Sequence, residues 1–233
     1  MRTITLLPGL ACDAALWSAQ TEALQADCDV TVSDVHQRHA GLPQMASALL
    51  AEQRGELILC GASMGGMLAL EVWRQAPRRV RAMALLGSSA RADTPELLRL
   101  RGDAIALYEQ GRWREVLGAN VAFAFEPRNA SADPTLVQRY LAMIERAGAQ
   151  QLIAQNRAVM ARPDSRPLLP DIDCPVLVAC GDADLLTPPD HSSEMAALLP
   201  RAELRIVDTC GHMLTMERPS QVNALLRDWL GRL

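Results

Sequence analysis

The chain contains no lysine, since all 23 of its basic residues are arginine. Reactions that need a lysine side chain are therefore excluded, among them Schiff-base formation, pyridoxal-phosphate catalysis and phosphate binding by a P-loop. No stretch approaches the roughly 20 consecutive apolar residues that span a bilayer. The six cysteines do not follow the spacing of a zinc site. We therefore expect no cofactor, no metal ion and no membrane association.

Strong charge of either sign is also missing. The formal net charge of the 233 residues is −4, with 49% apolar and 21% charged residues, which gives no electrostatic basis for binding nucleic acid. The length suits one domain, or one domain with an insertion. Cys60 and Cys180 fall in apolar runs, where cysteine is usually a small buried hydrophobe. We therefore predict free thiols and a cytoplasmic location.

Short apolar runs of strand character recur along the chain, and helix-like segments follow most of them. The runs are Thr3–Leu7, Val30–Ser33, Glu56–Cys60, Val80–Leu86, Pro175–Cys180 and Glu203–Val207. This alternation predicts an α/β fold with a doubly wound, mainly parallel sheet of about six strands, covered by helices on both faces.

The interval from Leu86 to Pro175 breaks this alternation because it has helical patterns and no convincing strand. The patterns cover Pro95–Gln110, Arg112–Ala124, Pro134–Ala147 and Ala149–Met160. Asp133-Pro134 is typical of a helix start. We therefore predict a core of residues 1–92 and 171–233 with a helical cap, 93–170, inserted between two strands. A longer set of crossover helices is the alternative.

A G-x-S-x-G element, Gly61-Ala62-Ser63-Met64-Gly65, lies between a strand-like run and a helix-like segment. A sharp turn from strand to helix holds the serine at its apex in a strained conformation, and the glycines leave room for that turn. A serine hydroxyl needs a neighbouring base to become a good nucleophile. Ser63 is therefore the candidate nucleophile.

Histidine is the expected base, and the chain has four. His36 and His39 lie in a polar loop before the serine and are expected to be solvated, and His191 is expected to be exposed at a helix start. His212 follows a strand and a short loop, and such loops form the active edge of parallel sheets. We therefore choose His212 as the catalytic base.

The carboxylate that orients the histidine should lie on a neighbouring loop. Asp182 and Asp184 both follow the apolar run Pro175–Cys180, and Asp208 is a more distant third candidate. Spacing alone does not choose between Asp182 and Asp184.

The chain resembles the α/β-hydrolase family over nearly its whole length. The resemblance rests on the G-x-S-x-G element, called the nucleophile elbow in this family, on the strand end Gly181-Asp182-Ala183-Asp184, and on the segment Gly211–Pro219. This last segment is similar to the histidine signature of the family. The family order of serine, acid and histidine is matched by Ser63, Asp184 and His212, and the family places its acid last in G-x-x-D. The resemblance therefore favours Asp184, and it implies a sheet trimmed at its amino-terminal end, beginning near Thr3.

The resemblance also implies an oxyanion hole formed by two backbone N–H groups. One belongs to Met64, the residue after the nucleophile. The other belongs to Leu10, although Pro8 replaces the histidine of the His-Gly pair that usually precedes this position. An H-G-G-G element is missing, which disfavours the lipases and esterases that use it.

The predicted function is hydrolysis of a carboxylic ester or lactone of a small, largely apolar acyl group through an acyl-enzyme. Ser63 excludes dehalogenases, which carry aspartate at the elbow, and the missing lysine excludes hydroxynitrile lyases. A thioesterase, an acyltransferase, a C–C hydrolase and a ligand-binding protein without turnover are the alternatives. The expected partner is a small-molecule substrate, and the sequence makes no prediction of oligomeric state.

Overall fold

A computed structural model describes residues 2–233. The apolar runs form one six-stranded sheet of order β2-β1-β3-β4-β5-β6, in which every neighbouring pair is parallel. The strands are β1 Thr3–Leu7, β2 Asp29–Val32, β3 Leu57–Ala62, β4 Val80–Leu86, β5 Val176–Gly181 and β6 Ala202–Val207. The predicted parallel sheet of about six strands is therefore confirmed, with the Thr3 strand as the first element.

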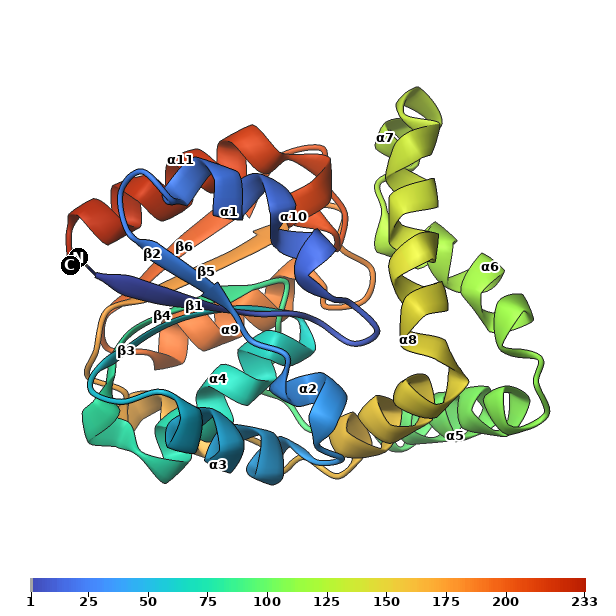
Figure 1. The fold of residues 1–233 in the computed structure, drawn as a ribbon, viewed down its shortest axis with the longest axis horizontal. Helices are drawn as coiled ribbons and strands as arrows, with labels where there is room; N and C mark the ends of the chain where they lie inside the picture. The colour runs from blue at the N-terminus through green and yellow to red at the C-terminus, as the bar shows by residue number, and fades with distance from the viewer. Residues whose placement is uncertain (1) are drawn as a thin grey trace.

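Helices cover both faces of the sheet because alternate side chains of a strand point to opposite faces. In β3, Leu57 and Leu59 belong to one apolar cluster, whereas Ile58 and Cys60 belong to the other. One face carries α1 (Ser18–Leu24) and α11 (Pro219–Gly231), and the opposite face carries α3 (Leu42–Glu52), α4 (Met64–Gln75) and α9 (Pro189–Leu198) (Figure 1). The doubly wound arrangement is thus confirmed.

Short helices complete the core. None of the helices described within residues 2–233 combines the length and apolarity needed to cross a membrane. The short helices are η1 Ala14–Trp17, α2 Val35–Arg38, η2 Pro77–Arg79 and α10 Leu214–Glu217. The six cysteines are free and buried.

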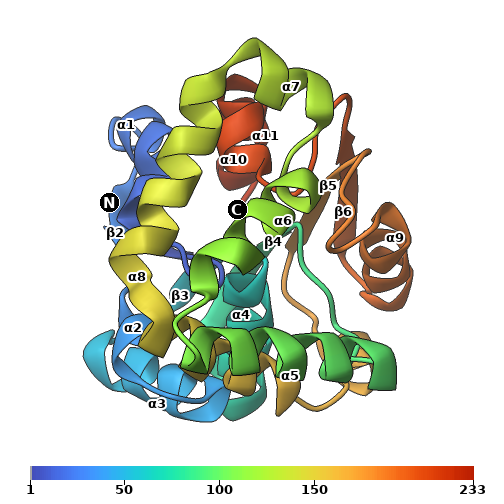
Figure 2. The ribbon, with the colours of Figure 1, turned by 90° about the vertical axis from the view of Figure 1, so that its right-hand side faces the viewer.

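Residues 93–170, called here the helical segment, connect β4 to β5. They contain α5 Pro95–Glu109, α6 Trp113–Ala124, α7 Pro127–Ala132 and α8 Pro134–Met160, and most of the 3-10 helix η3 Arg166–Asp171 that leads back to the sheet. Figures 1 and 2 show α6 and the first part of α8 in front of the carboxyl ends of the strands, with α5 lower, at the level of the helices α2 to α4. The division into a core and a separate cap domain stays a prediction.

Two details of the helical segment differ from expectation. The short helix α7 was not predicted. The two helices expected on either side of Gly148 are joined in α8, with Gly148 at φ 70° and ψ 170° as the break between them. Glycine adopts this positive φ without the steric cost that a side chain would add, so the long helix bends there.

The two ends of the helical segment are tied together by a buried ion pair. Asp93, where the segment begins, lies 2.9 Å from the guanidinium of Arg162, where α8 has ended, and the side chains are only 1% and 7% exposed. Arg101 of α5 adds a second contact of 2.7 Å to Asp93. Separating such a pair would leave a buried charge uncompensated, which is costly. These contacts therefore hold the start of the helical segment, at Asp93, against the end of α8.

Candidate active site

Ser63 occupies the turn between β3 and α4 with φ 52° and ψ −116°, a conformation that non-glycine residues rarely adopt. The flanking glycines are sterically required. A Cβ at Gly61 would overlap the backbone of Gly65, and a Cβ at Gly65 would overlap the carbonyl oxygen of Leu7 at the end of β1. The sharp strand-to-helix turn predicted from the G-x-S-x-G element is therefore present.

This steric role predicts a loss of stability for Gly65→Ala. Alanine normally favours a helix over glycine, but here its methyl group would press on the Leu7 carbonyl, so we expect the free energy of unfolding to fall by about 1–3 kcal/mol. The matched control is Gly102→Ala within α5, where an added Cβ meets nothing within 4 Å and about 1 kcal/mol of stabilisation is expected. Urea unfolding measures both. Equal effects in the two variants would contradict the steric account.

Asp184 and His212 form a buried acid–base pair on the loops that follow β5 and β6. The His212 Nδ1 lies 2.8 Å from Oδ2 and 3.0 Å from Oδ1 of Asp184, and the two residues are 8% and 1% exposed. The Asp184 carboxylate also accepts hydrogen bonds from the N–H groups of Leu186 and Thr187 and from the Thr187 hydroxyl, each at 2.9 Å. These contacts hold the carboxylate in one orientation against the imidazole ring.

The pKa of Asp184 reflects this environment. Burial opposes ionisation of the carboxyl group, but the adjacent His212 and the hydrogen bonds from Thr187 outweigh it and lower the pKa below its ordinary value. The carboxylate is therefore ionised at neutral pH. An ionised acceptor fixes the proton of the imidazole on Nδ1, which leaves Nε2 as the acceptor that a general base requires.

The end of β4 lies between the serine turn and the Asp184–His212 pair. Ser63 donates its backbone N–H to the Leu86 carbonyl at 2.8 Å, and the Ser88 hydroxyl donates to the Ser63 carbonyl at 2.8 Å. A Cβ at Gly87 would lie 3.3 Å from Asp184 Oδ2 and 3.5 Å from His212 Nδ1. Gly87 thus lets the three candidate residues approach one edge of the sheet.

Within residues 2–233, the side-chain hydrogen bonds of His212 all involve Nδ1, and none joins its Nε2 to the Ser63 hydroxyl. Such a bond is often long in a free enzyme and shortens when substrate binds. The structure therefore joins Asp184 directly to His212 and brings Ser63 near them through the end of β4.

The candidate oxyanion donors lie on either side of Ser63. Met64 is the first residue of α4, where backbone N–H groups are free of helical partners and the helix dipole favours negative charge. Residues 8–12, called here the oxyanion loop, follow β1. A Cβ at Gly9 would lie 3.3 Å from Ser63 Cβ, so the loop and Leu10 are adjacent to the serine. The loop keeps this position although Pro8 replaces the usual histidine.

The other aspartates and histidines have different roles. Asp182 accepts a hydrogen bond from the Cys210 N–H at 2.9 Å and so supports the histidine loop, while Asp208 is exposed. The expectation that His36 is solvated is wrong, because it is 2% exposed and its Nε2 lies 2.8 Å from the Cys12 carbonyl oxygen. His191 is half-buried instead of exposed, as α9 packs against the sheet.

Glu217 connects the histidine loop to the helical segment, a role that the sequence did not reveal. Its buried carboxylate accepts hydrogen bonds from the Gly211 N–H at 3.0 Å, from the Glu126 N–H at 3.0 Å and from the Asn129 side-chain amide at 2.8 Å. Burial raises the pKa of Glu217. Met213 adds a backbone bond of 3.1 Å to the Ala124 carbonyl. The segment around α7 is therefore fixed to the loop that carries His212.

Thr187 and Gly87 are further site residues that were not predicted. Thr187 stands three positions after Asp184, a spacing typical of an Asx-type turn, so a local signal for it exists. Gly87 follows the last residue of β4 and has φ 51°, but nothing in the sequence distinguishes it from other glycines after strands. Among the described residues, no group of three or more histidine, cysteine, aspartate or glutamate side chains could hold a metal ion.

Comparison with known proteins supports the assignment of the fold. A model of the α/β hydrolase fold matches residues 46–219. The pimeloyl-(acyl-carrier protein) methyl ester esterase of Aromatoleum aromaticum is 26% identical over 252 residues, covering 97% of this chain and 96% of that protein. A solved esterase from Thermogutta terrifontis aligns with a TM-score of 0.92 at 25% identity and covers 100% of this chain and 90% of its own.

A second solved structure, the enol-lactonase from Burkholderia xenovorans LB400, aligns with a TM-score of 0.90 at 21% identity and covers 99% of this chain and 91% of its own. This similarity supports the fold alone. The family model covers most of the chain, including the serine turn, and the expectation of a hydrolase is confirmed. The chain belongs to the α/β-hydrolase fold family.

Proposed function

We propose that this protein is a serine hydrolase that cleaves a carboxylic ester or lactone of a small, largely apolar acyl group. The observation that carries the proposal is the buried Asp184–His212 pair, 2.8 Å between Oδ2 and Nδ1, beside a strained turn that presents Ser63. The relative from Aromatoleum aromaticum, named as a methyl ester esterase, supports the same bond type.

In the proposed mechanism, His212 Nε2 accepts the hydroxyl proton while Ser63 Oγ attacks the carbonyl carbon. The negative oxygen of the tetrahedral intermediate is held by the N–H groups of Leu10 and Met64. His212 then donates the proton to the leaving alkoxide, the alcohol departs, and an acyl-enzyme remains. Water then attacks the acyl carbon while His212 Nε2 takes one of its protons, the bond to Ser63 Oγ breaks, and His212 returns that proton to Oγ as the acid leaves. Asp184 stabilises the imidazolium in both halves.

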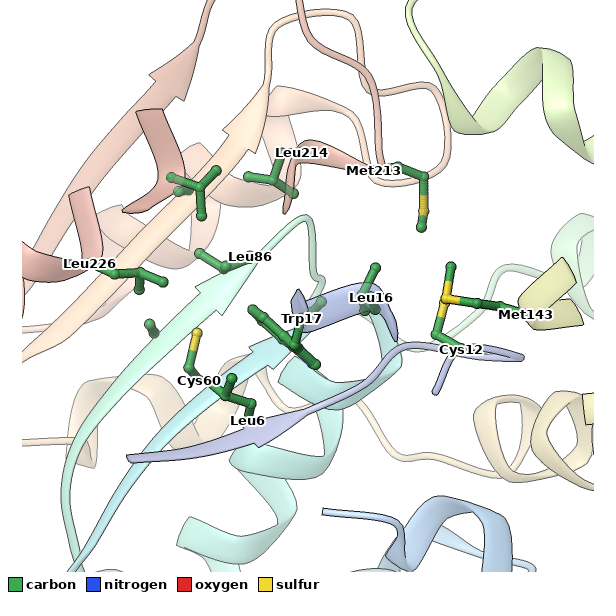
Figure 3. Packing of buried hydrophobic residues seen from close by; sticks show 14 of the residues in the cluster. Leu6, Cys12, Leu16, Trp17, Cys60, Leu86, Met143, Met213, Leu214 and Leu226 are labelled. Atoms are coloured by element: carbon green, nitrogen blue, oxygen red, sulfur yellow. The ribbon is translucent and has the colours of Figure 1, made fainter. Parts of the chain in front are cut away.

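Apolar side chains from the helical segment favour an apolar acyl group. Tyr140 and Met143 of α8 and Phe125 belong to the same apolar cluster as Cys12 of the oxyanion loop and Met213 beside the base. Figure 3 shows Met143 and Met213 pointing toward the region of Cys12. Residues of this kind exclude water from the acyl group and from the charged intermediate. We propose that the helical segment acts as a cap that selects the acyl group.

A panel of short-chain methyl esters, p-nitrophenyl esters, lactones and thioesters tests the proposed function. We expect turnover of esters and lactones, with fastest rates for unbranched apolar acyl groups, and stoichiometric labelling by a fluorophosphonate. Labelling without turnover of any panel member would contradict a hydrolase. Transfer of the acyl group mainly to an added alcohol would instead indicate an acyltransferase, and a strong preference for thioesters would indicate a thioesterase.

A further inference from the structure

Gln155 in the second half of α8 is fully buried, and its partners are far away in the sequence. Its Oε1 accepts a hydrogen bond of 2.6 Å from the Ala11 N–H, and its Nε2 donates one of 2.9 Å to the His36 carbonyl. Both ends of this amide are therefore used inside the protein, and one of them holds the oxyanion loop. A buried amide with both groups satisfied is a rigid support for the backbone it contacts.

His36 closes a ring of hydrogen bonds around the same loop. Its Nε2 lies 2.8 Å from the Cys12 carbonyl oxygen. Because a carbonyl can only accept, Nε2 carries the hydrogen. Burial lowers the pKa of His36, so its imidazole is neutral at pH 7. Gln155 thus holds Ala11 directly and supports the backbone of His36, whose side chain holds Cys12.

The oxyanion loop needs such support because its backbone is strained. Ala11 has φ 60°, a left-handed conformation that costs a non-glycine residue roughly 1–2 kcal/mol. The turn is closed by a bond of 3.1 Å from the Cys12 N–H to the Gly9 carbonyl. If Ala11 relaxed toward negative φ, the peptide plane that carries the Leu10 N–H would be displaced with it.

We propose that Gln155 is a positioning residue for the oxyanion hole: by binding the Ala11 N–H, it keeps the Leu10 N–H aimed at the oxyanion. This inference rests on the proposed function, since it takes Leu10 as a donor. The helical segment then contributes to the chemical step as well as to substrate selection. A change in donor direction weakens the bond to the tetrahedral intermediate more than the bond to the ground-state ester.

Gln151 provides a matched control one turn earlier on the same helix. It is partly buried, and its Nε2 has no hydrogen-bond partner, whereas both ends of Gln155 are bonded. Gln155→Met and Gln151→Met therefore remove the same amide from the same helix, and methionine fills a similar volume in each case. Only the first change removes a contact to the oxyanion loop.

The first experiment compares kcat and KM of these variants with p-nitrophenyl butyrate, together with inhibition by a trifluoromethyl ketone. The ketone forms a hemiketal with the serine, and its oxyanion needs the same two donors. For Gln155→Met we expect kcat to fall about 10- to 100-fold with little change in KM, and ketone affinity to fall in parallel. Gln151→Met should change kcat and ketone affinity by no more than about twofold each.

Two results would overturn the positioning role. One is an unchanged kcat in folded Gln155→Met. The other is a loss of kcat without a matching loss of ketone affinity, because a general effect on folding would not follow the oxyanion. Partial rescue of Gln155→Met by Ala11→Gly is expected, since glycine adopts positive φ without the cost that alanine pays. Absence of rescue would mean that the strain at Ala11 is not what Gln155 opposes.

Hydrogen exchange in the unaltered protein tests the contact without any variant. The Ala11 N–H should exchange at least about tenfold more slowly than the N–H of Leu185, a loop residue that is 61% exposed. Equal exchange rates would overturn the proposal even if Gln155→Met fails to fold. A protein with a protected Ala11 amide but no turnover of the panel would instead overturn the proposed function and leave the contact intact.

Discussion

Replacing Ser63 with alanine is expected to lower kcat for ester hydrolysis by about 10³-fold or more while the protein stays folded. The hydroxyl is the only group at this position that could form the acyl-enzyme, so no covalent route remains. Alanine occupies the same backbone conformation as serine, with the same steric cost at φ 52°, and the change therefore leaves the strain of the turn as it is. Steady-state kinetics and circular dichroism measure the two parts of this expectation.

Ser193→Ala is the control for the Ser63 variant. Ser193 lies exposed on α9 and donates its hydroxyl to the Pro189 carbonyl of the same helix, away from the site. This control should keep full activity and full fluorophosphonate labelling, whereas Ser63→Ala should lose both. Near-normal turnover by a pure, folded Ser63→Ala sample would remove Ser63 from the mechanism.

Asp184→Asn is expected to reduce kcat by about 10³- to 10⁴-fold, through the tautomer of His212. Two backbone N–H groups, from Leu186 and Thr187, donate to one oxygen of Asp184. Asparagine must place its carbonyl oxygen there, which turns its NH₂ group toward His212 Nδ1. The imidazole would then carry its hydrogen on Nε2 and could not accept the Ser63 proton.

Asp182→Asn is the comparison that tests this assignment. Asp182 accepts its hydrogen bond from the Cys210 N–H, and the carbonyl oxygen of asparagine can accept the same bond. We therefore expect a loss in kcat below about tenfold. The two changes are chemically identical and stand two positions apart, so general effects of losing one negative charge cancel. A larger loss in Asp182→Asn would show that the acid has been assigned to the wrong residue.

The strands were predictable because buried parallel strands leave continuous apolar runs in the sequence. For β1 and β4 the predicted runs have the same first and last residues as the observed strands. The serine turn was predictable for a related reason: Gly61 and Gly65 are required by backbone contacts that no other residue would permit. The acid was not predictable from spacing, because Asp182 and Asp184 differ only in which loop backbone they meet once folded. The family resemblance favoured Asp184, and the contacts now separate the two aspartates physically: Asp182 accepts from Cys210, whereas Asp184 pairs with His212.

Gln155 and His36 show why the remainder could not be predicted. A glutamine in an amphipathic helix and a histidine in a polar loop are ordinary surface residues by pattern. Their burial depends on α8 returning against the loop after β1, a contact between positions 144 residues apart. Local periodicity carries no information about such a pairing, and the polar groups became interpretable only when their partners were identified.

The order of the strands along the chain also determines when the site can form during synthesis. The strands β1 to β4, which carry the serine turn and the oxyanion loop, precede the helical segment in the chain, while β5 and β6 follow it. Asp184 and His212 join Ser63 only after this long connection has been made and the last strands have docked, and such non-local pairing is slow. A chain emerging from the ribosome therefore holds Ser63 before His212, and under the proposed mechanism we expect it to become reactive only when folding is nearly finished.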